Sequence, residues 1–173
     1  MKVHTLKRTQ RFPYLIDQVF SFFQMPENLS LITPPSLDFK ILTPSPIVMH
    51  QGVLIDYTIR WLTIPIHWTT LVTTYDPPHR FVDEQLRGPY ALWHHTHTFE
   101  EKDGWTEMTD EVRYALPLGA LGGFVRWAMV RHQLDEIFDH RSRVIGQVFG
   151  LDNASQERPR PFPRGVAYGE KPQ

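Results

Sequence analysis

The spacing of apolar residues changes between a long alternating region and the C-terminal part of this chain, and the change limits it to few folds. From Leu37 to Tyr114 apolar and polar residues alternate, as in GVLIDYTIRW at residues 52–61, which is typical of strands buried on one face. From Phe124 to Val148 the apolar residues recur every three or four positions, which predicts one long amphipathic helix. The sequence therefore predicts an α+β fold in which this helix packs against an antiparallel sheet.

The predicted long helix is the main docking element. At about 1.5–3 kcal/mol for each large apolar side chain, burying six of them contributes roughly 10 kcal/mol before the opposing entropy. The apolar stripe consists of Phe124, Trp127, Ala128, Leu134, Ile137, Phe138, Ile145 and Val148. The arginines of this helix are expected to be solvated charges beside the stripe, or else a surface for a membrane or a partner: Arg126, Arg131, Arg141 and Arg143.

Shorter elements precede the alternating region. Residues 3–11 are expected to form a first strand, and YLIDQVFSFFQ at residues 14–24 a short amphipathic helix, followed by one more helical turn in PENLSL. After residue 148 the chain is polar and rich in proline. We therefore divide it into one domain, residues 1–148, and a flexible tail, residues 149–173, whose RPRPFPR stretch could instead bind a partner or cover the sheet.

Composition excludes several classes of protein. Eighteen Lys and Arg against 19 Asp and Glu give a formal charge of −1, so no overall field favours nucleic acid, and we expect no nucleic-acid partner. Cysteine is absent, which removes disulfides and thiolate chemistry. The N-terminus lacks the apolar run of a signal peptide, and no window is long and apolar enough for a transmembrane segment. A cytoplasmic protein is expected.

The histidine-rich segment LWHHTHTFEE, residues 92–101, is joined to WTEMTDEVRYAL by Asp103-Gly104, which predicts a tight β-hairpin. The two-residue loop fixes which side chains share a face of the sheet. One face carries four cross-strand pairs: Trp93 with Tyr114, His95 with Val112, His97 with Asp110 and Phe99 with Met108. A turn at residues 62–63 similarly places Tyr57 opposite Trp68 and Ile59 opposite Ile66.

His95 and His97 are thus expected to point inward, and His94 outward. A zinc or iron site needs a third protein ligand on the inner face, and the hairpin guarantees only Asp110, so we predict no metal and no other cofactor. No serine-centred motif or cysteine suggests a nucleophilic enzyme. The simplest interpretation is a buried His97 that hydrogen-bonds Asp110 and has no further role, because burial requires a charge to be paired.

The run FVDEQLRGPYALWHHTHTFEE, then MTDEVRYALPLG and an arginine-containing amphipathic helix, resembles the START-like SRPBCC superfamily, specifically members related to polyketide cyclases and dehydrases. The resemblance implies a helix-grip fold: a curved antiparallel sheet of about seven strands, in the order β-α-α-β6-α, wrapped on the long C-terminal helix. The residues that match the family's spacing are Phe81, Asp83, Gln85, Gly88, Pro89, Trp93, His95, His97 and Phe99.

The inward face of strand 81–87 depends on the length of the Gly88-Pro89 loop. A three- or five-residue loop places Asp83 opposite His97 and Gln85 opposite His95, whereas a four-residue loop points Val82, Glu84 and Leu86 inward. We favour the first because it groups polar residues with polar partners.

The resemblance and the face pattern together predict a protein that binds a small hydrophobic molecule, such as a lipid, isoprenoid or polyketide, between the sheet and the long helix. The alternative is a cyclase or dehydratase in which His97 and Asp110 are catalytic. The ligand itself, any partner protein and the oligomeric state stay open. The predicted ligand-binding residues are Tyr57, Trp68, Asp83, Gln85, Trp93, His95, His97, Phe99, Met108, Asp110 and Tyr114.

Overall fold

A computed structural model describes residues 1–61, 64–117 and 123–151 of the chain. The predicted tail lies outside the described residues from position 152 onward. Among the residues that are described, no helix combines the length and apolarity needed to cross a bilayer.

The predicted order of elements is confirmed. The N-terminal part consists of β1 (His4–Phe12), α1 (Ile16–Phe23), the 3-10 turn η1 (Pro26–Asn28), α2 (Leu29–Ile32), a second 3-10 turn η2 (Pro35–Leu37) and β2 (Lys40–Ile41). The remainder consists of β3 (Leu54–Trp61), β4 (Ile64–Asp76), β5 (Arg80–Arg87), β6 (Leu92–Lys102), β7 (Trp105–Ala115) and α3 (Gly123–Val148).

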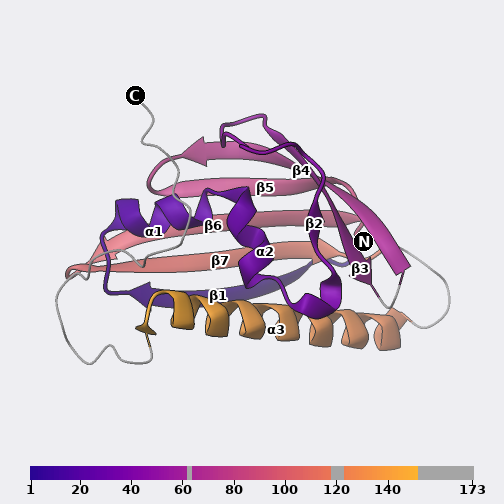
Figure 1. Cartoon of the computed structure of the whole chain (residues 1–173). Helices are drawn as coiled ribbons and strands as arrows, with labels where there is room; N and C mark the ends of the chain where they lie inside the picture. Colours follow the sequence, from indigo (N-terminus) through magenta and orange to yellow (C-terminus); the bar gives the residue numbers. More distant parts are fainter. Residues whose placement is uncertain (62–63, 118–122, 152–173) are drawn as a thin grey trace.

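The strands form one antiparallel sheet in the order β1-β7-β6-β5-β4-β3-β2. α1 and α2 lie in front of this sheet in Figure 1, and α3 runs along its β1–β7 side. The sheet therefore has one face that is covered by helices, which is where the alternating apolar residues are buried.

The predicted registers of both hairpins are confirmed. Asp103 and Gly104 have φ angles of 53° and 80°, the left-handed pair that a two-residue hairpin turn requires. Trp93 faces Tyr114 and His97 faces Asp110, as the Asp-Gly loop predicts. In the other hairpin Tyr57 faces Trp68.

The register of β5 differs from the expectation by two residues. Asp83 pairs with His95, and not with His97, whereas Phe81 pairs with His97. The predicted inward face of β5 is nevertheless correct, because a shift of two residues keeps the same side chains on the same face. The Gln85 amide bonds both main-chain groups of Tyr90, accepting from its N at 3.2 Å and donating to its O at 2.8 Å. Gln85 thus closes the loop between the strands and does not pair with His95.

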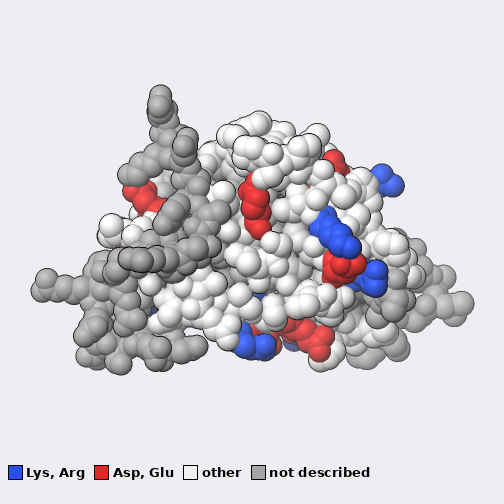
Figure 2. All heavy atoms as spheres, in the orientation of Figure 1, with Lys and Arg blue, Asp and Glu red and all other residues white. Residues whose placement is uncertain are grey.

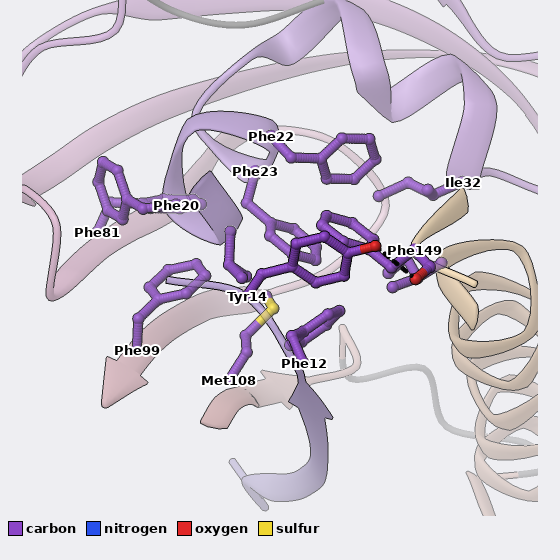
Figure 3. Close-up of a cluster of buried hydrophobic side chains, with 12 residues drawn as sticks. Phe12, Tyr14, Phe20, Phe22, Phe23, Ile32, Phe81, Phe99, Met108 and Phe149 are labelled. Atoms are coloured by element: carbon purple, nitrogen blue, oxygen red, sulfur yellow. Dashed lines mark hydrogen bonds between the residues drawn. The ribbon is translucent and has the colours of Figure 1, made fainter. Parts of the chain in front are cut away.

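A core of aromatic side chains fills the space where α1 and the end of α3 meet the sheet (Figure 3). Phe12, Phe22 and Phe99 are buried there, and Phe149 joins them from just beyond α3. The Tyr14 hydroxyl donates to the Phe149 carbonyl oxygen at 3.0 Å, shown as a dashed line in Figure 3. The core thus includes Phe149, one residue past the predicted domain boundary.

The apolar stripe predicted for α3 packs inward from Leu134 onward. Leu134, Phe138 and Ile145 are buried. Ala128 is exposed, contrary to the expectation. The side chains predicted at positions 124, 126 and 127 lie outside the part of the chain whose side chains the structure describes.

Candidate functional site

Four buried polar side chains and the partly buried Asp83, from four elements, meet on the helix-covered face of the sheet. β6 supplies His95 and His97, β5 supplies Asp83, β7 supplies Asp110, and α3 supplies Arg141. His95 and His97 are 6% and 4% exposed, so neither imidazole faces bulk water. The even spacing of His95 and His97 on β6 places both rings on this face, with centroids 3.8 Å apart.

The two imidazoles lie between the two carboxylates. Asp110 Oδ1 accepts a hydrogen bond from His95 Nε2 at 3.0 Å and lies 2.8 Å from His97 Nδ1 and 3.4 Å from the Arg141 guanidinium. On the other side, Asp83 Oδ2 is 2.9 Å from His97 Nε2 and 3.7 Å from His95 Nδ1. The contact of His97 Nδ1 with Asp110 is close but not aligned as a hydrogen bond. We call these five residues the His-Asp-Arg cluster.

The balance between burial and neighbouring charges shifts the pKa values of the two histidines in opposite directions. Burial alone would lower the pKa of His97, but the contacts with the Asp110 and Asp83 carboxylates outweigh it and raise the pKa. Burial and the neighbouring His97 lower the pKa of His95. For Asp110, burial opposes ionisation, but Arg141 and the two histidines hold the pKa well below its usual range. The cluster therefore favours protonation of His97 over protonation of His95.

A pH dependence of stability follows from the raised pKa of His97. The stabilisation that protonated His97 provides is complete below the unfolded-state pKa of about 6.5. It is lost as the pH rises through the higher folded-state pKa. We expect the unfolding free energy in urea with EDTA to fall as the pH rises above about 6.5, by at most about 1.4 kcal/mol per pH unit. Asp83, His95 and Asp110 have lowered pKa values and titrate below this window, and Arg141 stays charged.

A His97→Gln variant is the matched comparison for this pH profile. It lacks the titrating imidazole, so its unfolding free energy should stay flat over the same pH window. Parallel profiles for the two proteins would contradict a stabilising imidazolium at position 97.

Aromatic rings surround the cluster. Phe81 stacks on His97 with centroids 4.0 Å apart, and Trp93 meets His95 edge-on at 6.2 Å. The Arg141 guanidinium lies over the rings of Phe23 and Phe138, at 5.5 and 5.9 Å from their centroids. These contacts orient the polar groups and keep water from most of their surface.

The cluster borders two adjoining cavities. The first, of about 120 Å³, lies between the N-terminal helices and strands β3 to β6, and Asp83, His95 and His97 are part of its wall. The second, of about 160 Å³, lies between α2, η2, the sheet and α3. The residues that line both are Leu29, Ile32, Tyr57, Trp93, His95 and Arg141.

The structure brings together only part of the predicted ligand-binding set. Tyr57, Trp68, Asp83, Trp93, His95 and His97 line one or both cavities, and Asp110 lies directly behind the two histidines. Besides Asp110, four predicted residues line neither cavity. Phe99 and Met108 are buried in the aromatic core, Tyr114 packs in a second apolar cluster, and Gln85 binds the loop at Tyr90.

Arg141 is a site residue that the residue-type argument wrongly assigned to solvent. Its side chain is only 10% exposed, and it lines both cavities. The signal was present in the helical spacing, since Leu134, Phe138, Arg141 and Ile145 follow one another at intervals of four, three and four residues on the buried face.

No family model matches the chain, and no curated protein matches it in sequence. Solved structures do match. TTHA0849 from Thermus thermophilus has a TM-score of 0.63 at 12% identity, over 87% of this chain and 100% of that one. A START superfamily protein from Mycobacterium smegmatis has a TM-score of 0.62 at 10% identity, over 87% and 99%.

A third match, Ara h 8.0201, has a TM-score of 0.57 at 13% identity, over 84% of this chain and 99% of that one. At sequence identities this low, the similarity supports a conclusion about the fold alone. Together with the sheet and α3, they establish that the chain has the START-like helix-grip fold that the sequence resemblance implies.

Proposed function

We propose that the protein binds a small, mainly hydrophobic molecule in the two adjoining cavities. The observation that carries the proposal is the His-Asp-Arg cluster at the wall of cavities lined mainly by apolar and aromatic side chains. Small-molecule sites combine such walls with a few converging polar groups. Joined, the cavities approach the lower end of the usual volume range of about 300 to 1,000 Å³.

The polarity of the walls indicates the chemistry of the ligand. Ile32, Ile55 and Val72 contribute apolar surface, whereas Asp83, His97 and Arg141 contribute polar groups. A molecule with an apolar skeleton and one oxygen-bearing end fits this distribution. Figure 2 shows few Lys, Arg, Asp or Glu side chains over the described part of the face that carries α1 and α2, so an apolar molecule meets little charge there.

Filling the cavities is the direct test. Leu29 lines both, so a Leu29→Trp variant should weaken binding of the neutral fluorescent probe N-phenyl-1-naphthylamine by about tenfold or more, because the added ring occupies the space. Leu31→Trp, on the exposed side of the same helix, is the control and should bind as the unaltered protein does. Probe fluorescence in the presence of EDTA measures both.

The same experiment can refute the proposal. If the unaltered protein does not bind the probe, and native mass spectrometry of the purified chain finds no co-purifying small molecule, the cavities are packing defects. Equal affinities for the Leu29→Trp and Leu31→Trp variants would place the probe elsewhere.

An acid–base enzyme is the second candidate function, and one observation favours it: the His97 ring lines the first cavity while both carboxylates contact it. A general acid must be reachable by the substrate. Once a ligand is identified, His97→Gln separates the two functions, since an enzyme loses turnover while keeping affinity and a binding protein loses affinity only.

A further inference from the structure

We propose that Asp83, His95 and His97 form a binding site for one divalent first-row transition-metal ion, of the Zn(II) or Fe(II) type. The site lies at the wall of the first cavity and does not depend on the hydrophobic ligand. The β6–β7 hairpin alone offers too few ligands, which is why the sequence indicated no metal. The neighbouring strand β5 supplies the missing carboxylate.

The three side chains converge as ligands of one ion do. One potential ligand atom from each lies within 4.8 Å of the other two. Asp83 Oδ2 is 2.9 Å from His97 Nε2 and 3.7 Å from His95 Nδ1. Metal–ligand bonds of about 2.0–2.2 Å, at angles of about 90–110°, separate neighbouring ligand atoms by about 2.9–3.5 Å. Small side-chain rotations therefore suffice to close the site around an ion.

Asp110 occupies the position of a supporting carboxylate. Metal-binding imidazoles nearly always donate their second N–H to a carboxylate or carbonyl, which fixes the tautomer. His95 directs Nδ1 to Asp83 and Nε2 to Asp110, and His97 directs Nε2 to Asp83 and Nδ1 to Asp110. In the metal-free cluster His97 Nε2 donates to Asp83 Oδ2 at 2.9 Å, so a metal would replace the proton on this nitrogen, whereas His95 Nε2 keeps its hydrogen bond to Asp110.

Charge distinguishes the two carboxylates. Arg141 lies 3.4 Å from Asp110 Oδ1 and would repel a cation there, whereas Asp83 has a cation partner only if a histidine is protonated. Protonated His97 and Arg141 together balance the two carboxylates, and when an ion displaces the proton of His97 one negative charge is left uncompensated. A divalent ion at Asp83 supplies the missing positive charge.

Two further observations indicate a ligand at this place. His97 Nδ1, on the side of the ring that faces Asp110, is a buried nitrogen without a well-aligned hydrogen bond, so the metal-free position of the ring leaves it unsatisfied. All three proposed ligands also line the first cavity, which leaves coordination positions open to an exogenous oxygen. Three protein ligands with an open position are typical of catalytic rather than structural metal sites.

Metal content is the test. The untagged full chain, stripped with EDTA, is dialysed separately against Zn(II), Co(II) and, without oxygen, Fe(II), and the bound metal is measured by mass spectrometry. We expect one equivalent per chain for at least one ion. Asp83→Asn and His97→Gln should reduce the affinity by more than about 100-fold, and Asp110→Asn by about 10- to 100-fold.

His94→Gln is the matched control, because His94 lies on β6 but pairs with Glu84 at 2.9 Å on the other face of the sheet. It should keep the full equivalent. Circular dichroism of each metal-free variant checks folding. Should a variant unfold, X-ray absorption of the metal-loaded unaltered protein decides, because it must show two imidazole ligands.

Three results would each overturn the metal site. These are no stoichiometric uptake of any of the three ions, uptake abolished by His94→Gln, or uptake retained in folded Asp83→Asn. None of them affects the hydrophobic-ligand proposal, which is tested by probe binding in EDTA.

Discussion

Replacing Arg141 by methionine is expected to lower the free energy of unfolding by about 3 kcal/mol. Methionine keeps most of the apolar contact with Phe23 and Phe138 but removes the guanidinium next to Asp110. Removing one partner of a buried ion pair costs about 3–5 kcal/mol, because the other charge stays buried and uncompensated. We place the loss at the lower end because His97 also contacts Asp110. Urea denaturation near pH 7 measures it.

Arg143→Met is the control for this prediction. Arg143 lies two residues further along α3 and is exposed, so its replacement should change the unfolding free energy by less than about 0.5 kcal/mol. Adding Asp110→Asn to Arg141→Met removes the uncompensated carboxylate and should restore part of the stability. If adding Asp110→Asn lowers the unfolding free energy of Arg141→Met by about as much again, charge compensation is not the role of Arg141.

The geometry of the β6–β7 hairpin could be predicted because one local feature determines it. Asp103 and Gly104 both adopt positive φ, and a two-residue turn then fixes the partner of every residue in both strands. The inward orientation of His95 and His97 follows without any knowledge of the rest of the molecule. The same holds for Tyr57 and Trp68 in the β3–β4 hairpin.

The register of β5 could not be predicted in the same way. The loop between β5 and β6 is held by a side chain, since Gln85 bonds the main chain of Tyr90, and loop length alone does not reveal such a bond. The consequence is large for the site: Asp83 lies opposite His95 while its carboxylate reaches His97. A hydrogen bond within the loop decided what the loop length left open.

Arg141 was misassigned for a different reason. Charged residues on an amphipathic helix are usually solvated, and burying one requires a partner on another element. That partner, Asp110, comes from β7, 31 residues earlier in the chain. The helical spacing alone places Arg141 on the buried face, so spacing was the better guide than residue type.

Replacing Phe149 by alanine is expected to lower the free energy of unfolding by about 3–5 kcal/mol, the usual cost of removing a buried phenylalanine side chain. The side chain is 1% exposed. Its ring centroid lies 5.0 Å from that of Phe12 and 5.3 Å from those of Tyr14 and Phe22, so no neighbour is free to fill the space. Thermal and urea denaturation measure the loss.

Two comparisons separate packing from other roles of this position. Phe149→Leu keeps most of the apolar volume and should cost less than the alanine variant, whereas Met129→Ala, on the exposed side of α3, should cost little. Tyr14→Phe removes only the hydrogen bond to the Phe149 carbonyl and should cost about 1 kcal/mol. If Phe149→Ala is as stable as Met129→Ala, the end of α3 is not held by the aromatic core, and the helix must be anchored to the sheet elsewhere, through the cluster at Arg141.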